Sequence, residues 1–444
     1  MTIFISLEEV LKKTFENLKE YEDYFEEITI IRNAEGLISL FVKPAPEEGI
    51  IQKINEKLKD SLGAFWSEKI LFPGEEVSDK ALEEFIQKER TAASWEENKE
   101  KPRWFILERI LAKHAWFSKK GSMPWSFEEV ESGKPPVVVF YSFKGGMGRT
   151  TAMLFTALRL VYEGFNVALI DLDIEAPGLA SFLPDVAINT GVLDYILAKP
   201  IFKNELSVSR VVKEINMSKI FLSEEELVSE MFEHKSLSWG KFILVPAGNV
   251  NSEYIQKLAR VDYQFYEGAP IRDLLFELFN ELTEQYNLDF IFLDARAGFH
   301  DLCGLILSMA HQAVLFGVHS EESWNGLTEV IHFLARPEDN YPCSVIMVHS
   351  LAPGEHTPEL LVEKIKKEYR ERSYDIFCEY YYSEGEVPDP NDKDAPHYPV
   401  YIQWNPRLLG QVDISQKEVK DIFLSERCYT ELTEKIRLLK EKEE

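Results

Sequence analysis

The part of this chain that most directly suggests chemistry is a glycine-rich segment at residues 137–151, VVVFYSFKGGMGRTT. An apolar run leads into three closely spaced glycines and a threonine pair, and residues 152–164 that follow are amphipathic. This order predicts a strand, a tight loop and a helix, so that several backbone N–H groups point at one spot at the helix N-terminus. Such a cradle favours a polyphosphate. A tight turn with a purely structural role is the alternative.

Carboxylates follow two further apolar runs. Asp171 and Asp173 come at the end of the run that begins at residue 166, and Asp294 ends the run that begins at residue 288. Buried parallel strands that end in carboxylates place them at the carboxyl edge of a sheet, where an α/β fold binds its ligand. Asp171 or Asp173 could instead cap a helix.

The loop departs from the common phosphate-binding pattern GxxxxGK[ST] in two places. Phe143 stands where the first glycine is usual, and Arg149 stands where the lysine is usual. Arginine keeps the positive charge but is a longer, planar fork, so we expect phosphate binding to survive. A displacement of the bound phosphate by about 1 Å can lower the rate on the order of 100-fold. Slow hydrolysis and a nearly inactive nucleotide-binding switch both remain open.

The loop resembles the deviant P-loop, KGGxGK[ST], of the MinD/ParA/Mrp ATPase family, in an arginine-type form. The residues that carry this resemblance are Lys144, Gly145, Gly146, Gly148 and Thr150. Further strand-and-loop units in the expected order extend it over about residues 134–440, namely KFILVPAGN at 241–249, AVLFGVHSEESWNGL at 313–327, CSVIMVHSLAP at 343–353 and PVYIQWNPRLL at 399–409. The resemblance implies an α/β fold with a mostly parallel sheet, ATP and Mg²⁺ as cofactors, and a nucleotide-sandwich homodimer.

The resemblance also implies a role for each site residue. Lys144 would reach the phosphates bound by the second subunit, Arg149 those of its own subunit, and Asp173 would orient the attacking water. By the same resemblance, Asp171 and Asp173 belong to the loop that the family calls switch I, and Asp294 and Gly298 to switch II. Thr150 and Asp294 would hold Mg²⁺, with Asp171 as a more distant partner of the ion. The residues implied to contact the nucleotide are Gly145, Gly146, Met147, Gly148, Arg149, Thr150, Thr151, Gly298, Asn405 and Pro406. Of these, Gly298 would approach the γ-phosphate, and Asn405 and Pro406 would lie near the adenine.

Two interpretations of Arg296 are equally open. It follows Asp294 by two positions and could stabilise charge on a transferring phosphoryl group as an arginine finger. It could also be a surface cation that pairs with one of many acidic residues. The presence of Thr150, Asp173 and Asp294 together favours some hydrolysis.

Composition narrows the class of protein. The 444 residues are enough for two or three domains, and the hydrophobic content of 45% is that of an ordinary globular protein. With 49 Lys and Arg against 76 Asp and Glu, the formal net charge is −27, which makes nucleic acid an unexpected partner.

Targeting features are not evident. The N-terminus lacks the pattern of a signal peptide, no apolar run approaches the roughly 18 residues of a membrane span, and the C-terminal helix is not basic. The four cysteines show no CxxC pair, which fits reduced thiols and disfavours a metal cluster. We therefore expect a cytoplasmic protein that does not bind membranes.

The chain is expected to contain two domains. Residues 1–130 predict a small α+β module, with helices around 6–25, 47–62, 78–92 and 102–118 and two strands within 27–44. After a short joint at 131–136, the P-loop domain is expected over 134–444. It carries a mostly helical insertion at about 186–240, which either contacts a partner or caps the domain. The aromatic residues within 102–118 favour a core position over a docking surface.

Two classes of function follow. The first is a dimerising ATPase that switches an unidentified protein partner. The arginine-type loop, together with the DxR motif at residues 294–296, resembles a bacterial subgroup associated with conflict or signalling, so defence is one setting for it. The second is a non-catalytic nucleotide-binding scaffold or sensor. A tyrosine kinase of related fold ranks last, because Tyr380–Tyr382 is internal and the C-terminal end is poor in tyrosine. ATP and GTP are not distinguished, and the role of residues 1–130 is open.

Overall fold

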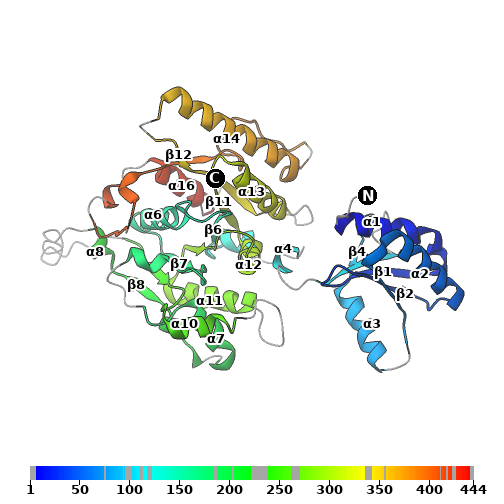
Figure 1. Ribbon diagram of the computed structural model, residues 1–444. Coiled ribbons are helices and arrows are strands. Elements are labelled where there is room, and N and C mark those ends of the chain that lie inside the picture. Colours follow the sequence, from blue (N-terminus) through cyan, green and yellow to red (C-terminus); the bar gives the residue numbers. More distant parts are fainter. Residues whose placement is uncertain are drawn as a thin grey trace, which may run out of the picture. The chain divides into compact units, whose positions relative to one another are not determined.

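The computed structural model divides the chain into two compact units, Met1–Ala112 and Lys113–Glu444, which are described separately (Figure 1). The division falls earlier than the predicted joint at 131–136. The residues that the structure describes are 7–74, 77–93, 95, 103–109, 114–117, 123–183, 188–202, 205–221, 239–261, 271–335, 343–354, 357–383, 385–410, 412–416, 419–422 and 427–440.

The first unit is a five-stranded mixed sheet with helices on both faces. Its strands lie in the order β3-β2-β1-β5-β4, with bounds Glu27–Arg32 (β1), Ile38–Lys43 (β2), Trp66–Leu71 (β3), Thr91–Ala92 (β4) and Trp104–Glu108 (β5). Alternate residues of β1 face opposite cores, because successive side chains of a strand point to opposite faces. Ile28 and Ile30 pack with helices α1 (Leu7–Leu18) and α2 (Glu48–Leu62), whereas Ile31 packs with Ile86 of α3 (Val77–Glu89).

The predicted helix at 102–118 is wrong. Trp104–Glu108 forms β5, which pairs in parallel with β1 at the centre of the sheet. Among the residues of this range that the structure describes, only His114–Phe117 is helical (α4). The run WFILE is apolar enough for either element, and the pairing with β1 decides in favour of a strand. The two tryptophans of residues 102–118 lie in different units: Trp104 is buried in the first unit, whereas Trp116 packs within the second.

The second unit contains an eight-stranded sheet with the order β13-β12-β11-β6-β10-β7-β9-β8. All neighbouring strands are parallel except the β8–β9 pair. The strand bounds are Val137–Ser142 (β6), Val167–Asp171 (β7), Lys213–Ile215 (β8), Phe242–Val245 (β9), Phe290–Asp294 (β10), Gln312–Gly317 (β11), Ser344–Ala352 (β12) and Val400–Gln403 (β13). This confirms the predicted α/β fold with a mostly parallel sheet.

Helices cover both faces of this sheet (Figure 1). One face packs against α6 (Arg149–Tyr162) and α16 (Arg427–Arg437). The other face packs against α7 (Val192–Phe202), α11 (Ile271–Tyr286), α12 (Asp301–Met309), α13 (Glu321–Leu334) and α14 (Glu359–Tyr380). Because both faces are buried, the central strands are apolar throughout rather than alternating.

The described part of the predicted insertion at 186–240 is not entirely helical. It holds α7, the edge strand β8 and the short helix α8 (Met217–Phe221), while residues 222–238 lie outside the described residues. β8 closes one end of the sheet by antiparallel pairing with β9. The remaining short elements are α5 (Phe127–Glu131), α10 (Ser252–Leu258) and the 3₁₀ turns Lys19–Tyr24, Gly63–Phe65, Leu179–Phe182, Val208–Arg210 and Pro406–Leu408.

None of the helices in the described part of the chain is both long and apolar enough to cross a bilayer.

A buried histidine ties the start of the large sheet to the segment before it. The His311 Nδ1 accepts a hydrogen bond from the Val137 N–H, and its Nε2 faces the Trp125 carbonyl oxygen, each at 3.0 Å. The side chain is fully buried, and burial lowers the pKa of His311 to about 4. Between about pH 4 and pH 6.5, His311 is therefore neutral in the folded protein and charged in the unfolded chain.

We expect His311 to make the fold less stable as the pH falls from about 6.5 to about 4, because only the unfolded chain takes up the proton in that window. The two pKa values predict that the free energy of unfolding decreases by about 3 kcal/mol over this pH range. Urea unfolding of the wild type and of His311→Gln at pH 7.5 and pH 4.5 measures it. The variant should lose less stability between the two pH values, and equal losses would contradict the assignment.

Candidate functional site

The glycine-rich loop joins β6 to α6 and leaves its backbone open. Gly146 and Gly148 have φ angles of 76° and 69°, which L residues with a Cβ rarely adopt. An added Cβ at Gly145, Gly146 or Gly148 would meet no atom within 4 Å, so space remains beside the loop. Within the described residues, the N–H groups of residues 145–148 donate to no other group of the chain. Free N–H groups at a helix N-terminus form an anion cradle.

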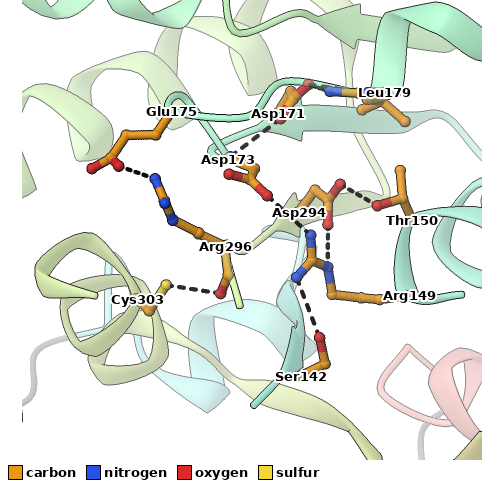
Figure 2. A network of polar contacts seen from close by, with 11 residues as sticks. Ser142, Arg149, Thr150, Asp171, Asp173, Glu175, Leu179, Asp294, Arg296 and Cys303 are labelled. Atoms are coloured by element: carbon orange, nitrogen blue, oxygen red, sulfur yellow. Dashed lines mark hydrogen bonds and ion pairs between the residues drawn. The ribbon is translucent and has the colours of Figure 1, made fainter. Parts of the chain in front are cut away.

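Arg149, the first residue of α6, turns inward beneath this loop. Its Nε donates to Asp294 Oδ1 at 2.6 Å, one Nη lies 3.5 Å from Asp173 Oδ2, and the other donates to Ser142 Oγ at 3.4 Å (Figure 2). The residue is only 9% exposed. Burial acts to lower the pKa of Arg149, but the Asp294 carboxylate, together with Asp173, outweighs it and holds the pKa above its usual value. Arg149 is therefore a buried cation whose guanidinium forms ion pairs with two carboxylates.

Thr150 and Asp294 form the second part of the site. The Thr150 hydroxyl donates to Asp294 Oδ2 at 2.7 Å, so one carboxylate holds both the hydroxyl and the Arg149 guanidinium. Asp294 ends β10 and pairs in register with Asp171, which ends β7. Because these strands are parallel neighbours, their terminal carboxylates meet at the carboxyl edge of the sheet, as predicted from the sequence.

Asp171 organises the loop that follows β7, residues 172–178, which is the predicted switch I loop. Its oxygens accept hydrogen bonds from the N–H groups of Asp173, Gly178 and Leu179 at 3.2–3.3 Å. Burial raises the pKa of Asp171 to about 8, and the nearby Asp294 carboxylate adds to the effect. In this structure Asp171 therefore contacts the loop rather than Thr150, and its role toward Mg²⁺ stays a prediction.

Asp173 lies where its carboxylate has an unused oxygen. Burial raises the pKa of Asp173, with Arg149 opposing the shift. Its Oδ1 is buried and has no hydrogen-bond partner among the described residues. The Arg149 guanidinium contacts Asp173 and Asp294, whereas Asp171 accepts from backbone N–H groups, so the cluster has more carboxylates than contacting cations.

This donor set fits a magnesium ion that is shared with a phosphate. Mg²⁺ takes oxygen ligands, keeps several waters and is usually held by one or two protein oxygens together with nucleotide phosphates. Thr150 and Asp294 supply these oxygens beside the free N–H groups, and the unpartnered Asp173 oxygen adds a further acceptor. Among the described residues, no cluster of three His, Cys, Asp or Glu could hold a metal alone.

An acidic residue connects the two loops at the rim of the site. Glu175 pairs with Arg296 (Figure 2). It also pairs with the His300 ring. Arg296 and His300 belong to the loop 295–300 after β10, the predicted switch II loop, whereas Glu175 belongs to the switch I loop. Arg296 therefore pairs with an acid in this structure, and its interpretation as an arginine finger stays a prediction.

Lys144 also has an acidic partner. Its ammonium group pairs with Glu322 in the first turn of α13, and the Lys144 side chain is 33% exposed. The pair is partly open to solvent, so its contribution to stability is small. Lys144 is positioned at the surface of the loop, and a modest competing interaction would free it.

Phe143 explains why the loop tolerates a residue other than glycine at its start. Its ring lies on α13 at Gly326, where an added Cβ would come within 2.1 Å of the ring. The ring also packs against Phe299 of the switch II loop, with centroids 5.1 Å apart. Phe143 thus fixes the beginning of the glycine-rich loop by packing.

The predicted adenine-side residues lie at the same edge of the sheet as the loop. β12 touches the loop, because the Ser350 hydroxyl donates to the Met147 carbonyl oxygen, and β13 pairs with β12. Asn405 begins the turn after β13, where its side chain accepts the N–H of Arg407 at 3.0 Å. Pro406 is exposed in that turn. The contact of these two residues with a base stays a prediction.

Gly298 lies in the switch II loop beside the end of β6. It has a φ of 81°, and its N–H donates to the Ser142 carbonyl oxygen at 3.2 Å. The predicted approach of Gly298 to a γ-phosphate stays a prediction.

The structure thus brings together Arg149, Thr150, Asp173 and Asp294, with Asp171 close behind them. Sequence reasoning missed Glu175, Glu322 and Ser142 as partners of the site residues. Glu175 carried a signal, since it extends the acidic pattern of Asp171 and Asp173 by one further alternate position. Glu322 carried none, because it lies 178 residues from Lys144 in the chain.

Comparisons with known proteins agree with this geometry. Residues 136–341 match the family model of the AAA domain. The match covers the glycine-rich loop and both strand-end carboxylates, and it is consistent with a P-loop ATPase domain in this part of the chain. The arginine-type subgroup stays a prediction. No curated protein matches the chain in sequence.

Solved structures of ParA and MinD proteins are similar to the chain at low sequence identity. The chain is similar to pNOB8 ParA bound to nonspecific DNA (17% identity, 69% of this chain and 98% of that chain, TM-score 0.41). It is also similar to an ATP complex of McdA from Cyanothece (14%, 69% and 96%, 0.41) and to the cell division ATPase MinD from Pyrococcus furiosus (16%, 68% and 99%, 0.39). At this similarity, functional conclusions depend on the geometry of the chain's own site.

We expect Gly326→Ala to destabilise the second unit by about 1–3 kcal/mol, because the new methyl group would overlap the Phe143 ring. Phe143→Ala should remove that overlap, so the double variant should lose less stability than the two single variants combined. Urea unfolding of the four proteins gives the coupling energy. Strict additivity would show that the ring does not lie on Gly326.

Proposed function

We propose that this protein is an ATP-dependent switch that dimerises around its nucleotides, hydrolyses ATP slowly and controls a protein partner. The observation that carries the proposal is the convergence of the free N–H groups of residues 145–148 with the Thr150–Asp294 pair at the N-terminus of α6. The cradle suits the phosphates, and the pair suits the Mg²⁺ that accompanies them. When bound, Mg²⁺ neutralises charge on the phosphates and orients them for transfer.

Arg149 accounts for the slow hydrolysis that we propose. Its guanidinium occupies Asp294 and lies next to Asp173, the residue we assign to orienting water. Both carboxylates must exchange this cation for new partners before they can serve the nucleotide. Because the pair is buried, breaking it without replacement is costly, on the order of 3–5 kcal/mol. Only a ligand that supplies compensating charge would open the site.

Lys144 supports the dimer. In the single chain it pairs with Glu322 and lies at the surface of the loop, in contrast to the buried Arg149. A lysine in this place is available to phosphates bound by a second copy of the chain. The proposed order of events is therefore nucleotide binding, release of Lys144 from Glu322, and pairing of two subunits across both nucleotides.

The partner that we propose is a protein. The insertion at about 186–240 and the first unit are the surfaces that could report the nucleotide state. Among the structures compared, pNOB8 ParA is bound to nonspecific DNA, so the expectation against nucleic acid rests on the net charge of −27 alone. The defence setting and the choice between ATP and GTP stay predictions from the resemblance.

The engagement of Arg149 favours one alternative, a nucleotide-binding scaffold or sensor without useful turnover. If the guanidinium stays on Asp294 when nucleotide binds, Asp294 cannot serve Mg²⁺ and the chain would report binding only. Turnover separates the two functions.

Turnover of ATP and GTP, measured with molecular mass in solution, tests the proposal on the full chain. We expect Mg²⁺-dependent hydrolysis and a nucleotide-induced dimer in the wild type, and loss of this hydrolysis in Thr150→Ala. Asp173→Ala should trap the dimer, and Lys144→Ala should not form it. Lys241→Ala is the matched control, since Lys241 is exposed immediately before β9, at the opposite edge of the sheet. Binding without turnover in the wild type would select the sensor, and absence of binding would refute both functions.

A second prediction concerns Arg149 itself. Arg149→Lys keeps the charge but removes the planar fork that contacts Asp294, Asp173 and Ser142 together. We expect turnover to rise about tenfold, because the carboxylates are released more easily. Steady-state kinetics with nucleotide affinity measured in parallel checks this. A fall in turnover at unchanged affinity would show that the arginine acts directly on the phosphates.

A further inference from the structure

A short segment packs against the switch II loop although it lies far from it in sequence. Helix α4 (His114–Phe117) lies beside α12, which follows the switch II loop (Figure 1). The Trp116 ring covers the backbone of α12 at Gly304. A Cβ at Gly304 would come within 2.9 Å of ring atoms of Trp116. The ring can approach the helix this closely only because residue 304 is glycine.

Trp116 is also hydrogen-bonded to the switch II loop. Its Nε1 donates to the His300 carbonyl oxygen at 2.8 Å. Its ring packs edge-on against Phe299 with centroids 5.2 Å apart, and against Phe333 of α13 at 5.0 Å. These contacts fix the ring through two different kinds of interaction, an N–H donor and aromatic packing.

The residues that Trp116 contacts also contact the site. His300 pairs through its ring with Glu175 of the switch I loop, and Phe299 packs against Phe143 at the start of the glycine-rich loop. Gly298, the predicted γ-phosphate contact, is adjacent to Phe299 in the chain. Trp116 is therefore linked to the switch I loop through His300 and to the glycine-rich loop through Phe299.

A comparison within the same unit shows what is particular to Trp116. Trp125 makes the same type of bond, from its Nε1 to the Pro135 carbonyl oxygen at 2.8 Å, and is buried to 4% exposure. Its partners, Pro135 and His311, lie before β6 and β11, at the amino edge of the sheet. Both residues are packed tryptophans with a backbone acceptor, but only Trp116 contacts the switch II loop.

We propose that Trp116 is a positioning residue that holds the switch II loop in register for the reaction. Its N–H fixes the carbonyl of His300 and its ring holds Phe299 against Phe143. The effect on turnover rests on the proposed function, whereas the effect on the loop does not. A misplacement of about 1 Å in a group near the phosphates can lower a rate on the order of 100-fold, so a modest loosening should be measurable.

Amide hydrogen exchange on the full chain without nucleotide tests the effect on the loop. The variants are Trp116→Phe, which removes the N–H donor, and Gly304→Ala, which displaces the ring and keeps the donor. Trp125→Phe is the matched control. We expect peptides that cover residues 296–304 to exchange about fivefold faster in the first two variants and unchanged in the control, because local opening becomes easier.

Kinetics test the effect on the reaction. We expect Trp116→Phe and Gly304→Ala to lower kcat about tenfold while the Kd for nucleotide changes less than about twofold, and Trp125→Phe to leave both unchanged. Unchanged exchange in residues 296–304 in both variants would overturn the inference whatever the protein does with nucleotide. Faster exchange with wild-type kcat would also overturn it and leave the proposed function intact. A wild type that binds no nucleotide would refute the proposed function, and the exchange result would then decide the role of Trp116 in the loop alone.

Discussion

The carboxyl edge of the large sheet depends on the pairing of buried Arg149 with Asp294. Parallel strands bring Asp171 and Asp294 into register, and the switch I loop adds Asp173, so three carboxylates gather where the sheet and the glycine-rich loop meet. Without a cation this arrangement would be strongly unfavourable, because buried carboxylates repel each other and lose hydration. Arg149 supplies one positive charge in the same place.

The positive charge of Arg149 does not balance the negative charge of the three acids, and this imbalance favours the entry of a further cation. Burial, followed by the nearby Asp294 carboxylate, raises the pKa of Asp171. The Arg149 guanidinium contacts Asp173 and Asp294 and offsets part of the excess negative charge. A divalent cation that arrives with phosphates would relieve the rest. Because Arg149 and such a cation compete for Asp294, filling the site and moving Arg149 are one event. A lysine, with its compact charge, would not hold Asp294, Asp173 and Ser142 simultaneously.

The succession of strands along the chain and the positions of the strand-end acids could be predicted from the sequence, whereas the direction of the side chains could not. The strands β6, β7 and β10 are continuous apolar runs, because both of their faces are buried, and β7 and β10 end at the acids of the site. The inward turn of Arg149 depends on acids contributed by two other segments, and the Lys144–Glu322 pair joins distant positions. The interpretation of β5 as a helix is wrong for a similar reason, since its pairing with β1 is invisible in a local pattern.

The three loops around the site are linked by specific contacts rather than by proximity alone. Glu175 joins the switch I loop to Arg296 and His300, and Phe143 joins the glycine-rich loop to Phe299. A ligand can shift such a set only by the difference between its affinities for the two arrangements. Phosphate binding at residues 145–148 would act on Arg149 and Asp294 directly, and through Phe143 and Glu175 on the switch II loop. The same linkage is reciprocal, so that a partner bound at the switch II loop must change the affinity of the nucleotide site by an equal factor.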